Sequence, residues 1–272
     1  MSRTIVSELA AAIAADREHC LLATDFDGVL APIVDDPERA TIDPSARQAL
    51  VRWAGLVGQV AIITGRPART AVRLAGLDSA DLRSLVVLGQ YGVERWDGAS
   101  GQYHDPEPPE RLAELRDRLP RVLSEAGWSE AVVEDKGRAL AVHTRRLPDP
   151  AGAFSDLRAP IQRLARELGL HLEPGKHVLE VRPTGMDKGR ALDELADSTG
   201  ARTVIYMGDD RGDLPAFDAV RRMSDTERTT CGVWAASPEQ PNLPGVADVV
   251  VEGPSGVATW LQTLADQVEA LA

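Results

Sequence analysis

The sequence has little of what marks several common classes of protein. Its 272 residues include only two cysteines, Cys20 and Cys231, which are far apart and lie in no CxxC or CxxH motif. This argues against a disulfide framework and against a zinc site, and favours two buried thiols in a reducing cytoplasm. No apolar run approaches the roughly 18 residues that a membrane span requires. We therefore expect a cytoplasmic protein without a membrane partner.

Positive charge is scarce as well. Lysine and arginine number 30 against 42 acidic residues, which gives a formal charge of -12. Nucleic acids and anionic membranes are bound by clustered lysine and arginine, so the composition argues against a nucleic-acid partner. A small anionic substrate remains compatible if local basic groups or a bound metal overcome the overall field. The hydrophobic content of 43% is enough for one large domain or two smaller ones.

Short apolar runs alternate with segments of helical spacing along most of the chain. The runs that predict strands are 21–24, 60–63, 85–88, 203–207, 233–235 and 249–251. Helices are predicted over 5–15, from Pro44, from Pro67, over 188–196 and over 255–271. The first of these carries Glu8 and no cationic leader, which favours an amphipathic helix over a signal peptide. The alternation predicts an α/β fold with a doubly wound, Rossmann-like parallel sheet.

The pattern changes between about residues 98 and 183. The proline-rich stretch 104–109 is typical of a linker, because successive prolines donate no backbone hydrogen bond. After it the spacing predicts helices over 110–126 and 154–168 and strands over 131–135, 139–144, 170–173 and 177–182. We interpret this as an inserted α+β cap domain with a hinge at its two connections. The predicted boundaries are 1–105 for the first part of the core, 106–183 for the cap and 184–272 for the second part of the core.

Two aspartates follow the first predicted strand. In Asp25-Phe26-Asp27-Gly28 the two carboxylates occupy alternate positions, which point the same way in an extended segment. The carboxyl end of a strand is where open α/β sheets bind ligands. One carboxylate can act as a nucleophile while the other transfers protons, provided that a cation offsets their repulsion. The same tetrapeptide also fits an ordinary turn. Other motifs are therefore needed to decide between a catalytic role and a turn.

Three further motifs follow or adjoin the predicted strands. Thr64-Gly65-Arg66 offers a hydroxyl and a backbone N–H that can hold a phosphate oxygen, although it also fits a simple helix cap. Lys188 lies at the start of a predicted helix, where a positive charge is unfavourable, so a purely structural role is disfavoured. The carboxylates of Asp209, Asp210 and Asp213 lie within five residues at a strand end and are costly without a cation. Such hard oxygen ligands favour Mg²⁺.

In this order the motifs resemble those of the haloacid dehalogenase superfamily of phosphotransferases. More narrowly, segments 25–33 (DFDGVLAPI) and 175–183 (GKHVLEVRP) are similar to the trehalose-6-phosphate phosphatase family. Supporting similarity is found at 134–137, 141–145 and 187–189. One motif departs from the family pattern Gly-Asp-Asp-x-Thr-Asp-Glu, because segment 208–214 reads GDDRGDL and lacks the threonine and the glutamate. The departure puts fine metal or substrate contacts in doubt and leaves the aspartates that face the metal.

The resemblance implies Mg²⁺-dependent hydrolysis of trehalose 6-phosphate. It makes Asp25 the nucleophile that forms an aspartyl phosphate, and Asp27 the general acid and base. It also implies that Thr64 and Lys188 neutralise the phosphate oxygens. The residues implied to hold Mg²⁺ are Asp25, Asp27 through its backbone carbonyl, Asp209, and Asp210 or Asp213 through bound water.

A disaccharide phosphate carries many hydroxyls, and a site that buries them needs matching polar groups. The candidate substrate contacts are Arg66, Glu134, Lys136, His143, Arg145, Lys176, Glu180 and Arg182. Side chains alternate between two faces along the strand at 177–182, so Glu180 and Arg182 are expected to point the same way. Each of these residues taken alone also fits a solvated strand face or a surface ion pair.

Two other functions fit the sequence. The chain could hydrolyse another sugar phosphate, such as a glucosyl- or mannosyl-glycerate phosphate, although the similarity at 175–183 weighs against this. It could instead be a non-catalytic regulatory module, either a receiver-like phosphoacceptor or a degenerate partner of a synthase. A degenerate paralogue would be expected to lose its catalytic groups, yet these are present: Asp25, Asp27, Lys188 and Asp209. Functional coupling to a trehalose-6-phosphate synthase is a further expectation.

Overall fold

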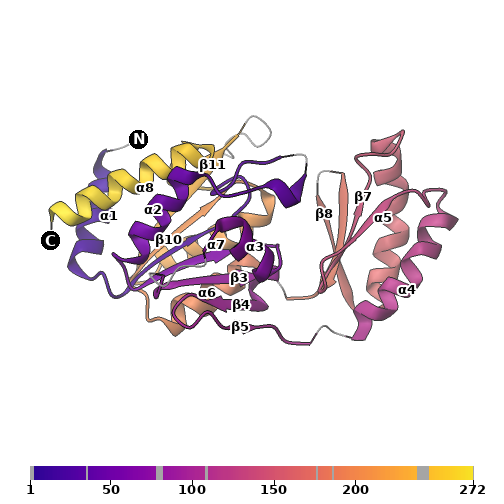
Figure 1. The fold of residues 1–272 in the computed structure, drawn as a ribbon, viewed down its shortest axis with the longest axis horizontal. Helices are drawn as coiled ribbons and strands as arrows, with labels where there is room; N and C mark the ends of the chain where they lie inside the picture. The colour runs from indigo at the N-terminus through magenta and orange to yellow at the C-terminus, as the bar shows by residue number, and fades with distance from the viewer. Residues whose placement is uncertain are drawn as a thin grey trace. The chain divides into compact units, whose positions relative to one another are not determined.

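The chain forms two compact units, each with its own sheet and its own hydrophobic core. The computed structural model describes residues 3–34, 36–77, 82–107, 110–175, 177–185, 187–237 and 245–271. The first unit contains Met1–Asp105 and Asp187–Ala272, and the second contains Pro106–Met186 (Figure 1). The second unit is therefore an insertion in the sequence of the first. In the described part of the chain, no helix combines the length and the apolar character needed to cross a bilayer.

An eight-stranded sheet is the centre of the first unit. Its strands are β1 (Cys20–Thr24), β2 (Gln59–Ile63), β3 (Leu85–Gly89), β4 (Glu94–Asp97), β5 (Tyr103–His104), β10 (Thr203–Gly208), β11 (Thr229–Ala236) and β12 (Val249–Glu252). Their order is β12-β11-β10-β1-β2-β3-β4-β5, in which β12 to β3 are parallel and β4 and β5 are antiparallel. The chain runs outward from β1 to β3 and later returns to β10, on the other side of β1. The predicted doubly wound α/β core is confirmed, with its switch point between β1 and β10.

Helices cover both faces of this sheet. One face packs against α1 (Arg3–Ala15), α2 (Pro44–Ala54), α3 (Ala68–Ala75) and α8 (Gly253–Ala270), and the other against α6 (Lys188–Ser198) and α7 (Leu214–Ser224). Figure 1 shows α8, in yellow, beside α1 and α2. Successive residues of one strand enter different cores: Leu22 packs with the first group of helices and Leu21 with the second. Burial on both faces explains why these strands read as continuous apolar runs.

The second unit is a four-stranded antiparallel sheet with two helices. Its elements are α4 (Glu110–Glu125), β6 (Val132–Asp135), β7 (Leu140–His143), α5 (Pro150–Glu167), β8 (Leu170–Gly175) and β9 (Val178–Pro183), and the strand order is β6-β7-β9-β8. Helix α5 begins four residues before the predicted start, because Asp149 caps it by accepting the N–H of Gly152 and Pro150 occupies its first turn. Leu179 and Val181 enter the core with the helices, which confirms the predicted alternation along β9.

Strands β4 and β5 and helix α7 were not predicted. Strand β4 reads Glu-Arg-Trp-Asp, and of its apolar groups only Trp96 joins the core, so it lacks the apolar run that marks the buried strands. Helix α7 did carry a signal, since Phe217, Val220 and Met223 are buried at helical spacing. The described residues also form three short 3-10 turns, η1 (Pro37–Arg39), η2 (Gln90–Gly92) and η3 (Arg211–Asp213).

Candidate active site

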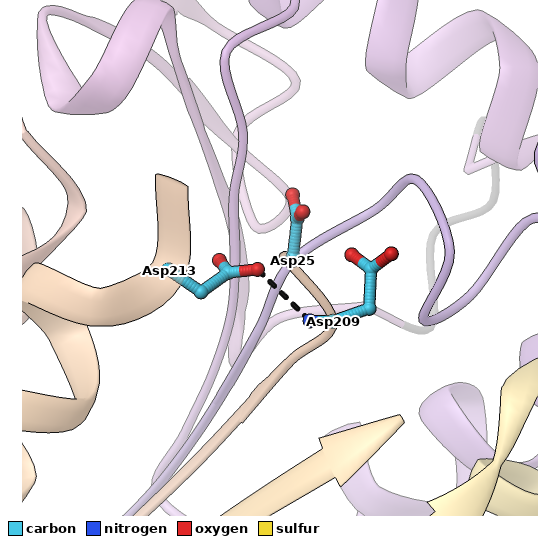
Figure 2. A group of neighbouring side chains, drawn as sticks. All are labelled: Asp25, Asp209 and Asp213. Atoms are coloured by element: carbon cyan, nitrogen blue, oxygen red, sulfur yellow. Dashed lines mark hydrogen bonds between the residues drawn. The ribbon is translucent and has the colours of Figure 1, made fainter. Parts of the chain in front are cut away.

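The first carboxylates of the site lie at the carboxyl ends of two neighbouring parallel strands. Asp25 follows β1 and Asp209 follows β10, and the backbone N–H of Asp25 donates to the carbonyl oxygen of Met207 at 2.8 Å. Gly28 has a φ of +75°, and a Cβ there would lie 2.1 Å from the Asp209 Oδ2. The glycine of Asp-x-Asp-Gly is therefore needed for the two motifs to approach. Figure 2 shows Asp25 and Asp209 side by side, with Asp213 reaching toward them from the start of α7.

Asp213 is a fully buried acceptor of four hydrogen bonds. Its Oδ1 accepts from the Lys188 Nζ at 2.7 Å and from the Tyr206 hydroxyl at 2.5 Å. Its Oδ2 accepts the backbone N–H groups of Asp209 at 2.9 Å and Asp210 at 3.2 Å, the first of which is dashed in Figure 2. Asp213 thus connects three parts of the site in one hydrogen-bond network: the acidic loop that carries Asp209 and Asp210, a tyrosine of β10 and the lysine of α6.

Lys188 lies between two carboxylates. It is the first residue of α6, and its Nζ is 2.8 Å from the Asp25 Oδ2 and 2.7 Å from the Asp213 Oδ1. Its side chain is 5% exposed. The two carboxylates offset the unfavourable position of a cation at the positive end of a helix. The residue is consequently fixed beside the candidate nucleophile.

Burial shifts the pKa values of Asp25, Asp209 and Asp210. It raises the pKa of Asp25 well above the ordinary value; Lys188 opposes this and the charge of Asp213 adds to it. Burial and then the charge of Asp25 raise the pKa of Asp209 to about 9, and burial and then Asp213 raise the pKa of Asp210. Burial by itself would lower the pKa of Lys188, but Asp213 and Asp25 outweigh it and hold that pKa well above its usual range. One buried cation therefore faces an excess of buried carboxylates.

The excess of carboxylates fits a divalent cation. Asp25, Asp209 and Asp213 each offer an oxygen, and these oxygens lie within 4.8 Å of one another. Carboxylate oxygens are the hard ligands that Mg²⁺ prefers. Asp210 contributes its side chain differently, because its Oδ1 caps η3 by accepting the N–H of Gly212 at 2.8 Å. Asp25 and Asp209, which the sequence associates with a metal, are thus two of the three carboxylates that could hold one, and Asp213 is the third.

Mg²⁺ binding and stability are expected to change with pH in a linked way. The raised pKa values of Asp25 and Asp209, the latter about 9, mean that protons compete with a metal, so Mg²⁺ affinity should rise as the pH rises from 6 toward 9. The folded metal-free protein binds more protons than the unfolded chain, whose aspartates titrate near 3.9. The free energy of unfolding of the metal-free protein should therefore be highest at acid pH and fall as the pH rises through the folded pKa values.

Calorimetry with Mg²⁺ and thermal melting in EDTA, both over pH 6 to 9, would measure the two effects. Asp209→Asn is the matched control, because it removes one titrating carboxylate with little change in shape and should flatten both slopes. Equal Mg²⁺ affinity at pH 6 and pH 9 would contradict the expectation.

The Thr64 motif is joined to Asp27 through Arg66. Thr64 follows β2 and is buried, and its Oγ1 accepts the backbone N–H of Arg66 at 3.1 Å. The Arg66 guanidinium donates to both carboxylate oxygens of Asp27 at 2.7 Å and to the carbonyl oxygen of Pro37 at 3.0 Å. The sequence suggested Arg66 as a substrate contact, and the structure brings it onto Asp27. Its two parallel hydrogen bonds fix the orientation of that carboxylate.

Two further groups support the site. Sequence reasoning missed the first, while the family resemblance placed the turn of the second, 89–92, near the substrate. Tyr206, in β10, donates to Asp213, and its signal was a tyrosine two residues before the acidic motif in an otherwise aliphatic strand. Gln90 is buried after β3, and its Nε2 donates to the carbonyl oxygen of Gly65 at 3.1 Å. Gln90 and Tyr91 have left-handed φ values of 49° and 59°, which is rare for residues other than glycine. This bend holds the chain after β3 against the Thr64 motif.

The second unit gathers most of its candidate substrate contacts on the sheet face opposite its helices. The ion pairs there are Lys136–Glu180 at 2.7 Å, His143–Glu134 at 2.8 Å and Arg182–Glu173 at 3.2 Å. Strand register places Glu134, Glu180 and Glu173 on one row across the sheet. Arg145 is exposed in the loop after β7, and Lys176 lies outside the described residues. The second unit thus carries a polar face with both signs of charge.

Solved structures share this fold over nearly the whole chain. The C-terminal domain of trehalose-6-phosphate phosphatase from Candida albicans has a TM-score of 0.71 at 19% identity, covering 98% of this chain and 97% of that one. A haloacid dehalogenase-like hydrolase from Bacteroides thetaiotaomicron has a TM-score of 0.64 at 18% identity, covering 90% of this chain and 99% of that one. The chain therefore has the fold of the haloacid dehalogenase-like hydrolases.

The sequence narrows the class to a family. The model of the trehalose-phosphatase family matches residues 23–242, so the chain belongs to that family, as the motifs predicted. An uncharacterized glycosyl hydrolase of Mycobacterium tuberculosis is 34% identical over 252 residues, covering 89% of this chain and 18% of that protein. A trehalose-phosphate phosphatase of Mycobacterium marinum is 31% identical over 271 residues, covering 91% of this chain and 62% of that protein. The chain thus spans about a fifth of the first relative and less than two thirds of the second.

Proposed function

We propose that the chain is a Mg²⁺-dependent phosphatase that hydrolyses trehalose 6-phosphate to trehalose and phosphate. The observation that carries this proposal is the buried Asp25 carboxylate, held 2.8 Å from the Lys188 Nζ in a member of the trehalose-phosphatase family. The relative from Mycobacterium marinum is itself named a trehalose-phosphate phosphatase. The polar face of the second unit supplies groups suited to the hydroxyls of a disaccharide.

In the first step the Asp25 carboxylate attacks phosphorus. The backbone N–H of Phe26 donates to its Oδ1 at 2.6 Å and Lys188 holds its Oδ2, so the carboxylate has one defined orientation. The bond from phosphorus to the sugar oxygen breaks, which leaves an aspartyl phosphate. Lys188 and the Thr64 hydroxyl neutralise charge on the phosphate oxygens. A Mg²⁺ held by Asp25, Asp209 and the Asp27 carbonyl would add positive charge there and offset the repulsion between the two anions.

Asp27 transfers a proton in each of the two steps. As an acid it gives a proton to the departing sugar oxygen, and as a base it takes one from the water that hydrolyses the aspartyl phosphate. Arg66 orients Asp27 through two hydrogen bonds of 2.7 Å. When Asp27 is protonated, its hydroxyl oxygen is a weaker acceptor than a carboxylate oxygen, so one of the two bonds from Arg66 weakens. Arg66 is then available to a substrate oxygen, which reconciles its position with a substrate contact.

The proposal for the substrate rests on the polar face of the second unit. Glu134, Lys136, His143, Glu180 and Arg182 would accept and donate hydrogen bonds to the hydroxyls of the two glucose rings, with Arg145 and Lys176 as further candidates from the adjoining loops. Carboxylates are strong acceptors for sugar hydroxyls, and the paired cations hold them in place. A substrate that lacks the second ring would leave these groups without partners.

Phosphate release from trehalose 6-phosphate, glucose 6-phosphate and p-nitrophenyl phosphate, each with Mg²⁺ and with EDTA, tests the function. A strong Mg²⁺-dependent preference for the disaccharide supports the proposal. Activity on the small esters alone would keep the catalytic residues and move the substrate to another sugar phosphate, such as a glucosyl- or mannosyl-glycerate phosphate. Absence of activity on all three esters would contradict the proposal that the chain is a phosphatase.

A regulatory role is the second candidate. The C-terminal domain of the Candida albicans trehalose synthase regulatory protein has the same fold, with a TM-score of 0.66 at 11% identity over 94% of this chain. The fold alone therefore does not separate an enzyme from a regulator. The buried Asp25, Lys188 and Asp209 favour the enzyme, because a buried carboxylate cluster is costly to keep without a use. Coupling to a trehalose-6-phosphate synthase would be tested by adding that synthase to the phosphate-release assay.

Glu180→Gln is expected to separate sugar recognition from chemistry. The change removes a buried negative charge that pairs with Lys136 while keeping the shape. We expect the KM for trehalose 6-phosphate to rise about tenfold, the size of a lost hydrogen bond to a charged group, with the KM for p-nitrophenyl phosphate unchanged. Glu167→Gln, at the exposed pair with Arg118, is the matched control and should change neither value. Equal losses on both substrates would argue against a sugar contact.

A further inference from the structure

Tyr206 stands out because its hydroxyl donates a hydrogen bond to a charged side chain at the centre of the site. The residue is fully buried in β10, and its hydroxyl donates to the Asp213 Oδ1 at 2.5 Å. The same oxygen accepts from the Lys188 Nζ at 2.7 Å. The Asp213 Oδ1 thus accepts one hydrogen bond from a residue of β10 and one from Lys188, the lysine beside Asp25.

The ring of Tyr206 is held independently of its hydroxyl. It packs edge-on against Phe217 at 5.4 Å between ring centroids, and Phe217 lies 5.7 Å from Trp234. Gly208, two residues further along, has no side chain, and a Cβ there would lie 2.5 Å from the Asp213 Cγ. The strand therefore supplies both a donor aimed at Asp213 and the space for Asp213 to reach it.

Four donors use the hydrogen-bonding capacity of Asp213. An ionised carboxylate has about four lone-pair sites, and here Lys188 and Tyr206 share Oδ1 while the N–H groups of Asp209 and Asp210 share Oδ2. A metal bound directly by Asp213 would have to displace one of them. Asp25 and Asp209 can bind a metal without breaking this network.

We propose that Tyr206 and Asp213 form a positioning pair that holds Lys188 beside the Asp25 carboxylate, and that Asp213 acts through Lys188 and the acidic loop without binding the metal directly. The inference rests on the proposed function for its kinetic consequences and on geometry alone for its structural ones. Tyr206 is a positioning residue, since its hydroxyl donates to Asp213 and acts on Lys188 through that carboxylate. Its loss should slow phosphoryl transfer and leave substrate and metal binding intact.

Tyr206→Phe removes the hydroxyl and keeps the ring. We expect kcat on trehalose 6-phosphate to fall about tenfold, as for a lost hydrogen bond to a charged group, with KM within about twofold. The Mg²⁺ dissociation constant, measured by calorimetry, should also stay within about twofold, because no direct ligand has changed. A loss of Mg²⁺ affinity as large as the loss in kcat would overturn the inference, and so would an unchanged kcat.

A double-mutant cycle tests the route from Tyr206 to Lys188. In an Asp213→Asn background, Tyr206→Phe should cause no further fall in kcat, because the acceptor charge through which it acts has gone. Tyr103→Phe, which removes a hydroxyl elsewhere in the first unit, is the matched control and should leave kcat unchanged. Phe217→Leu disturbs the packing of the Tyr206 ring and keeps its hydroxyl. Additive losses in the cycle, or a kcat loss for Phe217→Leu equal to that for Tyr206→Phe, would contradict the positioning role.

Lysine modification gives a reading that needs no activity. The chain has three lysines, Lys136, Lys176 and Lys188, so reductive methylation followed by mass spectrometry reports on each one separately. Lys188 should react several times faster in Tyr206→Phe than in the wild type, with Lys136 unchanged as the internal reference. Unchanged protection of Lys188 would refute the pair. If the wild type hydrolyses no phosphate ester, the proposed function fails while this measurement still decides the positioning inference.

Discussion

Asp25→Asn is expected to reduce turnover of trehalose 6-phosphate by at least about 10⁴-fold, because an amide cannot form the acyl phosphate. The fold should survive. Burial raises the pKa of Asp25 and so favours its neutral form in the metal-free protein at mildly acid pH, where asparagine has nearly the shape and charge of that form. Melting in EDTA should therefore give a Tm within a few degrees of the wild type.

The variant separates the nucleophile from its surroundings. Asp218→Asn, at an exposed aspartate of α7, is the matched control and should leave both turnover and Tm unchanged. Mass spectrometry after mixing with substrate should detect a phosphorylated wild type and no phosphorylated Asp25→Asn. Turnover by Asp25→Asn at a rate close to that of the wild type would refute the assignment of the nucleophile.

The core of the fold could be predicted because burial dictates its sequence. Strands covered on both faces need continuous apolar runs, and β1, β2, β3 and β10 have them. Strands β4 and β5 form the end of the sheet and carry mostly polar residues, so the pairing of β4 with β3 and of β5 with β4 is set by tertiary contacts that leave no local pattern. The second unit was predictable from a different pattern, since its helices and strands have one apolar and one polar face.

Part of the site also followed from the sequence. Asp25 and Asp209 were expected to meet because the family resemblance implies that both hold Mg²⁺, and the structure places them at the carboxyl ends of two neighbouring parallel strands. The pairing of Arg66 with Asp27 could not be predicted, because it depends on how the turns after β1 and β2 bring two side chains together. The contact of Tyr206 with Asp213 was equally hidden, since it joins a strand residue to a turn through a rotamer choice. Motifs thus locate chemical groups, and packing decides which of them touch.

Lys188→Met should cause the largest combined loss of activity and stability. Methionine keeps the length of the side chain, and it leaves the Asp25 and Asp213 carboxylates buried without their cation. Removing one partner of a buried ion pair costs about 3–5 kcal/mol, which corresponds to a Tm lower by roughly 10 °C. The kcat should fall at least about 10³-fold, because no fixed ammonium neutralises the phosphate oxygens.

The pH dependence of this loss identifies its cause. Burial raises the pKa of Asp25 well above its usual value, so lowering the pH protonates Asp25 and relieves its repulsion with the Asp213 carboxylate. The Tm difference between Lys188→Met and the wild type should therefore be large at pH 8 and shrink toward pH 5. Added Mg²⁺ should restore part of the Tm at pH 8 by supplying another cation. Lys136→Met, which breaks the less buried pair with Glu180 in the second unit, is the matched control and should lower the Tm by much less. A Tm deficit for Lys188→Met that is the same at pH 5 and pH 8 would show that lost packing, rather than uncompensated charge, destabilises the variant.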